Sequence, residues 1–124
     1  MEDFSNEAYF LFFSALANRT SLAIIDVLSA GPKNISGLSE ALEHDETAVA
    51  AILHRLENLA LLRAEGSGRE KVYSLNMEIL APLSELLTFH TSKYCPNLKI
   101  CISPEKLKEY MKKEAAKGTF IEHA

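Results

Sequence analysis

The chain has 124 residues and a mass of 13.8 kDa, which is enough for one domain that buries its own hydrophobic core. Apolar residues make up 48% and charged residues 24%, and no run of about 18 apolar residues occurs, so the composition indicates a globular protein and argues against a membrane-spanning helix. The formal net charge of −4 argues against a deep basic channel for nucleic acid, although clustered cations leave room for a few phosphate contacts.

The N-terminal helix, predicted over residues 5–16, carries apolar side chains on most of its faces. These are Tyr9, Phe10, Leu11, Phe12, Phe13 and Leu16. A helix that is apolar all round is either buried or shared with a partner, so this segment is the first indication of a dimer. No basic segment precedes it, so we expect no secretory signal and place the protein in the cytoplasm.

Two further helices are predicted before residue 43. One begins after Asn18, a good N-cap, and ends at Gly31 and Pro32. Its apolar side chains are Leu22, Ile24, Ile25, Val27 and Leu28. The next is short, over residues 36–42, and its side chains expected to point inward are Ile35, Leu38, Ala41 and Leu42.

The fourth helix, residues 46–58, has a clear amphipathic pattern. Asp45 can cap it after a turn at residues 43–45, so the third and fourth helices form a helix-turn-helix. The apolar face repeats at steps of four and three residues and consists of Val49, Leu53, Leu56 and Leu59. The opposite face consists of Thr47, Ala48, Ala51, His54, Arg55 and Asn58.

After Leu62 the apolar period changes from that of a helix to that of a strand. Two extended pieces flank the glycines at 66–68, which predicts a β-hairpin and hence a winged helix. A helix follows over residues 80–93 with Pro82 in its first turn, and a last one begins at Ser103 and ends near residue 117. The predicted fold class is mainly α with a small hairpin. We divide it into a domain 1–93 and an extension 94–124 with a cysteine-bearing loop and the last helix.

This order of elements resembles the ArsR-type family of winged helix-turn-helix regulators, named after the arsenic repressor. The resemblance lies in "ALANRTSLAIIDVL", in "ISGLSEAL" with "TAVAAILHRLENLALL", and in "GREKVYSL". It implies a homodimer that forms through residues 5–16 and 80–93. It also implies a repressor whose recognition helices enter successive major grooves of double-stranded DNA, while the wings touch the backbone or the minor groove.

The resemblance assigns the DNA contacts to the outer face of the fourth helix and to the wing. On the helix they are Thr47, Ala48, Ala51, His54 and Arg55. On the wing, Arg69 and Lys71 are expected to contact phosphate.

The chain departs from the family at three positions of this helix. Family members commonly carry polar side chains where this sequence has Ala50, Ala51 and Ile52. Alanine can touch a thymine methyl group, but it cannot form a bidentate hydrogen bond with a base. Glu46 would repel phosphate unless it accepts from a cytosine amino group. Base recognition then depends on Thr47, His54 and Arg55, or on DNA shape.

Two cysteines, Cys95 and Cys101, lie close to His90 in the stretch "HTSKYCPNLKIC". Three interpretations stay open: a redox-switched disulfide, a Zn²⁺ or other thiophilic metal site completed by His90 or a partner subunit, or two small buried side chains. The family's usual metal sites are not matched, because "ISGLSEALEHD" lacks Cys-x-Cys and residues 80–93 lack Asp-x-His. We assign no cofactor beyond these alternatives.

The sequence offers no catalytic grouping, because its Ser, His and Asp residues are scattered over separate predicted elements, so we expect no enzyme activity. Two functions compete. One is a DNA-binding repressor; the other is a winged-helix interaction module that packs its alanine-rich fourth helix on another protein. Acidic charge at Glu43, Asp45 and Glu46 favours the module, and the basic wing favours DNA.

Overall fold

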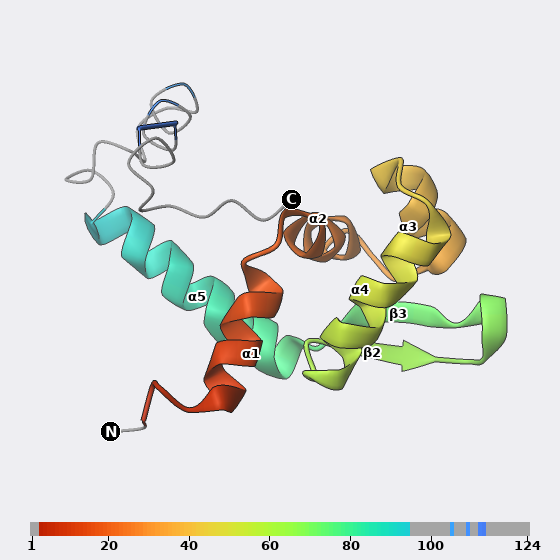
Figure 1. Cartoon of the computed structure of the whole chain (residues 1–124), viewed down its shortest axis with the longest axis horizontal. Helices are drawn as coiled ribbons and strands as arrows, with labels where there is room; N and C mark the ends of the chain where they lie inside the picture. Colours follow the sequence, from red (N-terminus) through yellow and green to blue (C-terminus); the bar gives the residue numbers. More distant parts are fainter. Residues whose placement is uncertain (1–2, 95–104, 106–108, 110–111, 114–124) are drawn as a thin grey trace. The chain divides into compact units, whose positions relative to one another are not determined.

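The computed structural model describes residues 3–94, 105, 109, 112 and 113 (Figure 1). The chain divides into two compact units, one that ends at Ile79 and one that begins at Leu80, and each is described by itself. The first unit holds helices α1 to α4 and a three-stranded sheet, in the order α1–α2–β1–α3–α4–β2–β3. This arrangement confirms the predicted fold class of helices with a small β-hairpin.

The helices of the first unit begin at polar caps. Helices α1 to α4 span Glu7–Leu16, Arg19–Leu28, Ile35–Leu42 and Glu46–Asn58. Before each, a side-chain oxygen accepts a hydrogen bond from a backbone N–H of the first turn; these caps are Asn6, Asn18, Asn34 and Asp45. Asn18 and Asp45 confirm the prediction. Asn6 and Asn34 move the starts of α1 and α3 to residues 7 and 35, from the predicted 5 and 36.

The wing is an antiparallel sheet with strand order β1–β3–β2. Strands β2 (Leu62–Glu65) and β3 (Val72–Leu75) form the predicted hairpin, and a short 3₁₀ turn, Gly68–Glu70, lies between them. Strand β1, Lys33–Asn34, pairs with β3 and is absent from the prediction. Two residues are too few to show an alternating pattern, so this strand could not be recognised from the sequence.

Helix α4 buries the face that its periodicity predicts. Val49, Leu53 and Leu56 have no exposed surface, and Leu59 is half-buried at the C-cap. The other buried apolar side chains of this unit are Ala15, Ile24, Leu28, Leu38, Leu61 and Leu62. Because one face of α4 is held in this core, the opposite face is on the outside of the unit.

One side chain that was expected to point inward is exposed. Ala41 lies in the last turn of α3, next to the left-handed residue Glu43 (φ 56°) at which the helix ends. The prediction for this position is wrong, while the helix that contains it is present. In α2, Ile24 and Leu28 of the apolar set are buried, whereas Leu22 lies on the other side of the helix and is 52% exposed.

Helix α5 spans Met77–Tyr94 and begins before the predicted start at residue 80. The cause is Asn76, whose carbonyl accepts from the N–H of Ile79 (3.1 Å) and whose side chain accepts from the N–H of Glu78 (3.2 Å). Pro82 therefore lies inside the helix, and the prediction that it occupies the first turn is wrong.

Beyond Tyr94, the C-terminal extension is described at four positions, all helical: Glu105, Glu109, Lys112 and Lys113. They fall within the predicted last helix. Its predicted start at Ser103, its predicted end near residue 117, and the loop with Cys95 and Cys101 lie outside the described residues.

Helix α1 and the residues before it leave large apolar side chains on the surface. Phe4, Phe10, Leu11 and Phe13 are each more than half exposed, between 51% and 67%. An apolar groove of about 540 Å³ lies here, lined by Phe4, Ala8, Tyr9, Phe12, Phe13 and Leu59. Within the described residues no single helix has the length and apolar character to cross a bilayer; only α1 and α2 taken together, with a bend of 72°, reach that length and composition.

Candidate nucleic-acid interface

The exposed face of α4 carries all five contact residues that were predicted on this helix. Thr47, Ala48, Ala51, His54 and Arg55 are exposed. They lie on the exposed face because the buried stripe of the same helix points into the core. The helix start is fixed as well: the Asp45 carboxylate accepts from the N–H of Ala48 at 2.7 Å. The geometry therefore presents one polar and alanine-bearing surface on a rigid helix.

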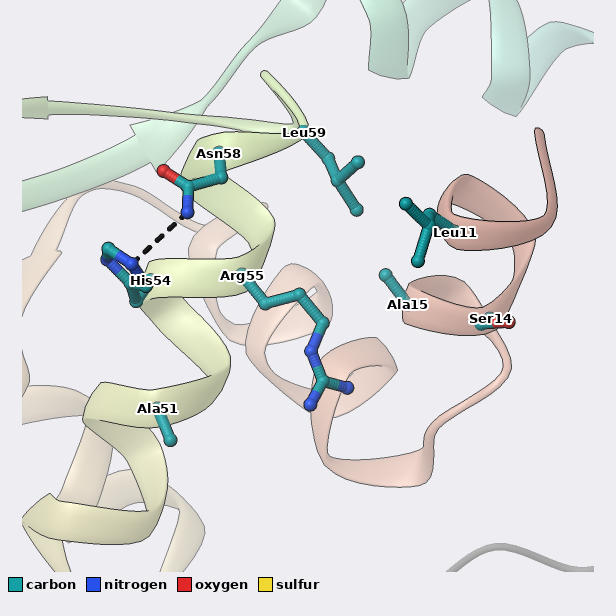
Figure 2. A pocket seen from close by; sticks show the side chains of 8 residues that line it. All are labelled: Leu11, Ser14, Ala15, Ala51, His54, Arg55, Asn58 and Leu59. Carbon is teal, nitrogen blue, oxygen red and sulfur yellow. Dashed lines mark hydrogen bonds between the residues drawn. The ribbon is translucent and has the colours of Figure 1, made fainter. Parts of the chain in front are cut away.

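Asn58 extends this surface by one turn. Its Nδ2 lies 3.2 Å from Nε2 of His54, four residues earlier on the same face (Figure 2). An amide and an imidazole are both able to hydrogen-bond base edges, and asparagine pairs well with adenine. Asn58 lies on the predicted outer face but is not among the predicted contact residues, although its spacing of four residues from His54 is a signal that the sequence contains.

The wing cation Arg69 contacts the start of α4. One guanidinium nitrogen lies 2.9 and 3.0 Å from the two carboxylate oxygens of Glu46 and 3.5 Å from the hydroxyl of Ser36. Arg69 and Glu46 are exposed over 76% and 39% of their side chains. Glu46 was expected to repel phosphate and Arg69 to bind phosphate. The structure instead pairs the two, so that Arg69 neutralises the charge of Glu46.

The second wing cation, Lys71, is paired with the C-terminal half of α4. Its ammonium lies 3.1 Å from Oε1 of Glu57 and 5.5 Å from the centre of the Tyr73 ring. The hydrogen bond to Glu57, followed by the charge effect of Tyr73, raises the pKa of Lys71 above its ordinary value. Both predicted phosphate ligands of the wing therefore already have a carboxylate partner on α4.

A third cation holds the base of the wing. Arg63 of β2 lies 3.2 and 3.3 Å from Oδ1 of Asn76 and 3.5 Å from the Glu78 carboxylate. Asn76 is buried and also donates to the carbonyl of Ala60 at 2.7 Å. Sequence reasoning missed this network, which joins the end of α4, the first wing strand and the start of α5.

A cleft of about 580 Å³ lies between α4 and α1. Figure 2 shows Arg55 extending from α4 into the space between the two helices, with Leu59 and Leu11 facing each other above it. Within the described residues, the guanidinium of Arg55 has no hydrogen bond or ion pair, and its backbone carbonyl accepts one from the N–H of Leu59. Of the cations near α4, Arg55 is thus the one whose charge is not neutralised by a neighbouring carboxylate in that part of the chain.

The chain was compared with known proteins. No family model matches it. The HTH-type transcriptional regulator NmtR of Mycobacterium tuberculosis is 35% identical to it over 77 residues, which are 62% of this chain and 64% of that protein. The match therefore spans slightly less than two thirds of the curated relative.

Two solved structures share the fold. HlyU from Vibrio cholerae has 26% identity and a TM-score of 0.56, over 77% of this chain and 99% of that one. The homodimeric winged helix-turn-helix DNA-binding domain of a possible ArsR-family transcriptional regulator from Mycobacterium bovis has 25% identity and a TM-score of 0.60, over 71% and 82%. The chain has the same winged helix-turn-helix fold as this possible ArsR-family regulator, and it is similar in sequence to NmtR. In this fold, α3 and α4 form the helix-turn-helix, and β2 and β3 form the hairpin of the wing.

The metal and thiol predictions fall mostly outside the described part of the chain. Within residues 3–94 and the four later described positions, no three His, Cys, Asp or Glu side chains are grouped to hold a metal ion. His90 is exposed on α5, with its ring 5.4 Å from that of Tyr94. Cys95 and Cys101 are not among the described residues, so their pairing stays a prediction.

Proposed function

We propose that the chain is a cytoplasmic, DNA-binding transcriptional regulator that represses by occupying a short palindromic operator. The observation that carries this proposal is the outer face of α4, where Thr47, His54 and Arg55 are exposed on the second helix of a helix-turn-helix. A recognition helix presents its contact residues to the major groove in this way. The printed names of NmtR and of the Mycobacterium bovis domain, as regulator and DNA-binding domain, support the same function.

The proposal includes a homodimer. Phe10 and Phe13 of α1 are exposed to an extent that is unusual for large apolar side chains outside an interface. The Mycobacterium bovis domain is described as homodimeric. We therefore assign the face of α1 that carries Phe10 and Phe13 to the contact between protomers, together with the α5 segment that the resemblance implies. A dimer would then present two α4 helices to a two-fold symmetric site.

DNA binding can be measured by fluorescence anisotropy with duplexes from the region upstream of the protein's own gene. We expect the logarithm of the association constant to fall linearly with the logarithm of the salt concentration, because phosphate contacts release counterions. Arg55→Ala is expected to cost about 1–3 kcal/mol on the operator and less on a scrambled duplex, because Arg55 reads bases. Lys112→Ala removes the same charge at an exposed position outside α1, α4, the wing and α5, and serves as the matched control.

The alternative function is a winged-helix module that binds another protein. It is supported by the pairing of Arg69 with Glu46 and of Lys71 with Glu57, which leaves the wing with little net charge for phosphate. The same titration separates the two functions. Binding that is weak, independent of salt and unchanged by Arg55→Ala would refute the regulator and favour the module.

The proposal leaves three possible roles for Cys95 and Cys101: a redox-switched disulfide, a metal site, or two buried side chains. A redox disulfide between Cys95 and Cys101 predicts two fewer free thiols under oxidising conditions. A metal site with His90 predicts bound Zn²⁺ or another thiophilic metal in the purified protein. Two reactive thiols with no metal under all conditions would leave only the structural role for these residues.

A further inference from the structure

We infer that the cleft between α1 and α4 binds a small organic anion with an apolar body, and that this ligand competes with DNA for Arg55. The binding half of the inference concerns the protein alone. The competition half rests on the DNA-binding function proposed above.

The cleft has the size and lining of a small-molecule site. Its volume of about 580 Å³ lies within the range of about 300–1,000 Å³ that is typical of such sites. Its apolar lining residues are Leu11, Ala15, Ala51 and Leu59. Its polar lining residues are Ser14, His54, Arg55 and Asn58. All eight belong to the same compact unit, so the cleft lies within one unit of the chain.

Arg55 determines the charge of the ligand. Its side chain extends into the space between the helices (Figure 2) and has no acidic partner within the described residues. A guanidinium group matches the geometry of a carboxylate or a phosphate and binds either through two parallel hydrogen bonds. By contrast, Arg69 and Lys71 have their charge already matched by Glu46 and Glu57. The unmatched cation therefore marks the position of an anionic group.

The walls of the cleft determine the remainder of the ligand. Leu11 from α1 and Leu59 from the end of α4 face each other across it (Figure 2), and Ala51 adds a small apolar surface on the other side of Arg55. Inorganic phosphate would leave these walls in contact with water, whereas a ring or short alkyl group would cover them. The chemistry thus favours an aromatic or aliphatic carboxylate over a bare inorganic anion.

Occupation of the cleft would affect DNA binding directly. Arg55 is exposed on the recognition face of α4, and its guanidinium cannot bind a ligand carboxylate and a base at the same time. Any factor by which the ligand lowers DNA affinity must equal the factor by which DNA lowers ligand affinity. The cleft would make the protein an anion-responsive regulator, with the ligand as inducer.

The binding half is tested on the full chain by isothermal titration and by amide shift changes in NMR spectra. The probe is 2-naphthoate; its neutral amide, 2-naphthamide, and inorganic phosphate are the comparison compounds. For a ligand of this size we expect a dissociation constant on the order of 1 mM, with shift changes at α1 and α4 residues of the cleft. The amide and phosphate are each expected to bind at least about tenfold more weakly.

Arg55→Gln is expected to weaken 2-naphthoate about tenfold and to leave 2-naphthamide unchanged, because only the charged contact is lost. Arg69→Gln removes the same charge outside the cleft and should leave 2-naphthoate binding unchanged. Ala51→Leu, which fills the cleft without changing charge, provides a second test. The inference is overturned if 2-naphthamide or phosphate binds as tightly as 2-naphthoate, or if 2-naphthoate does not bind at about 10 mM. It is also overturned if the amide shift changes are confined to the groove at Phe4 and Phe12.

The competition half is tested with the operator duplex. Saturating 2-naphthoate should reduce the DNA affinity of the wild type about tenfold and that of Arg55→Gln less than twofold, since the shared residue is then absent. A protein that binds 2-naphthoate through Arg55 but binds no DNA would refute the proposed function and leave the site intact. A protein that binds DNA equally well with the cleft filled would refute the competition.

Discussion

Neutralising Glu46 should release Arg69 and thereby strengthen DNA binding. In the free protein one nitrogen of Arg69 lies within 3.0 Å of both Glu46 oxygens, so the charge of Arg69 is matched by the carboxylate at the start of α4. Glu46→Gln removes the negative charge and leaves Arg69 able to contact phosphate. Because 76% of the Arg69 side chain and 39% of the Glu46 side chain are exposed to solvent, the substitution should lower the free energy of unfolding by no more than about 1 kcal/mol.

The size of the DNA effect follows from the number of counterions released. Each new phosphate contact changes the slope of log affinity against log salt by about −0.9, and a dimer gains two contacts, so the slope should become steeper by about 1.8. Between about 200 and 50 mM salt, the ratio of variant to wild-type affinity should therefore rise about tenfold. The measurement is an anisotropy titration of the operator duplex at four or more salt concentrations.

Two controls isolate the Arg69 contribution. The double variant Glu46→Gln, Arg69→Gln should return the slope to that of the wild type. Asp26→Asn makes the same change in net charge on α2 and should leave the slope unaltered. An unchanged slope in Glu46→Gln, or a loss of affinity confined to the operator, would refute the reasoning; the second result would mean that Glu46 accepts a hydrogen bond from a cytosine amino group.

Three further predictions concern assembly and stability. Replacing both Phe10 and Phe13 by Glu should convert the dimer to monomers in sedimentation equilibrium, with little loss of monomer secondary structure, because both rings are exposed on α1. Asn76→Ala should lower the free energy of unfolding by about 2–3 kcal/mol in urea titrations, because this buried side chain serves Ala60, Arg63 and the first turn of α5. The pair with Glu57 raises the pKa of Lys71. The contribution of this pair to the free energy of unfolding should therefore be complete below the ordinary lysine pKa of about 10.4 and be lost as the pH rises through the higher pKa of the folded state. Lys71→Gln should remove this alkaline pH dependence of the melting temperature.

The parts of the fold that could be predicted are those with local causes. The apolar stripe of α4 and its Asp45 cap lie within one stretch of sequence, so the recognition helix and its outer face could be derived from periodicity and capping alone. The start of α5 also has a local signal, because Asn76 is a good N-cap residue directly before Met77. Pro82 favours a later start, since proline is common in a first turn, and this second signal makes the predicted start too late.

The parts that could not be predicted depend on residues far apart in the chain. Arg69 and Glu46 are separated by 23 positions and Lys71 and Glu57 by 14, and only the folded sheet brings each pair together. The sequence therefore indicates a basic wing whose cations are free to bind phosphate. The structure instead pairs Arg69 and Lys71 with carboxylates of α4. The cleft beside Arg55 likewise needs the packing of α1 against the rest of its unit, which no sequence pattern specifies.

Asn34 has two roles, and together they couple the wing to the helix-turn-helix. Its backbone pairs with Val72 of β3, and its side chain caps α3 through the N–H of Gly37. A change in the orientation of the hairpin should therefore also displace α3, which packs against α4. Substitutions in β3 beside Asn34 and in α3 should for that reason change the free energy of unfolding by amounts that do not add, whichever partner the protein binds.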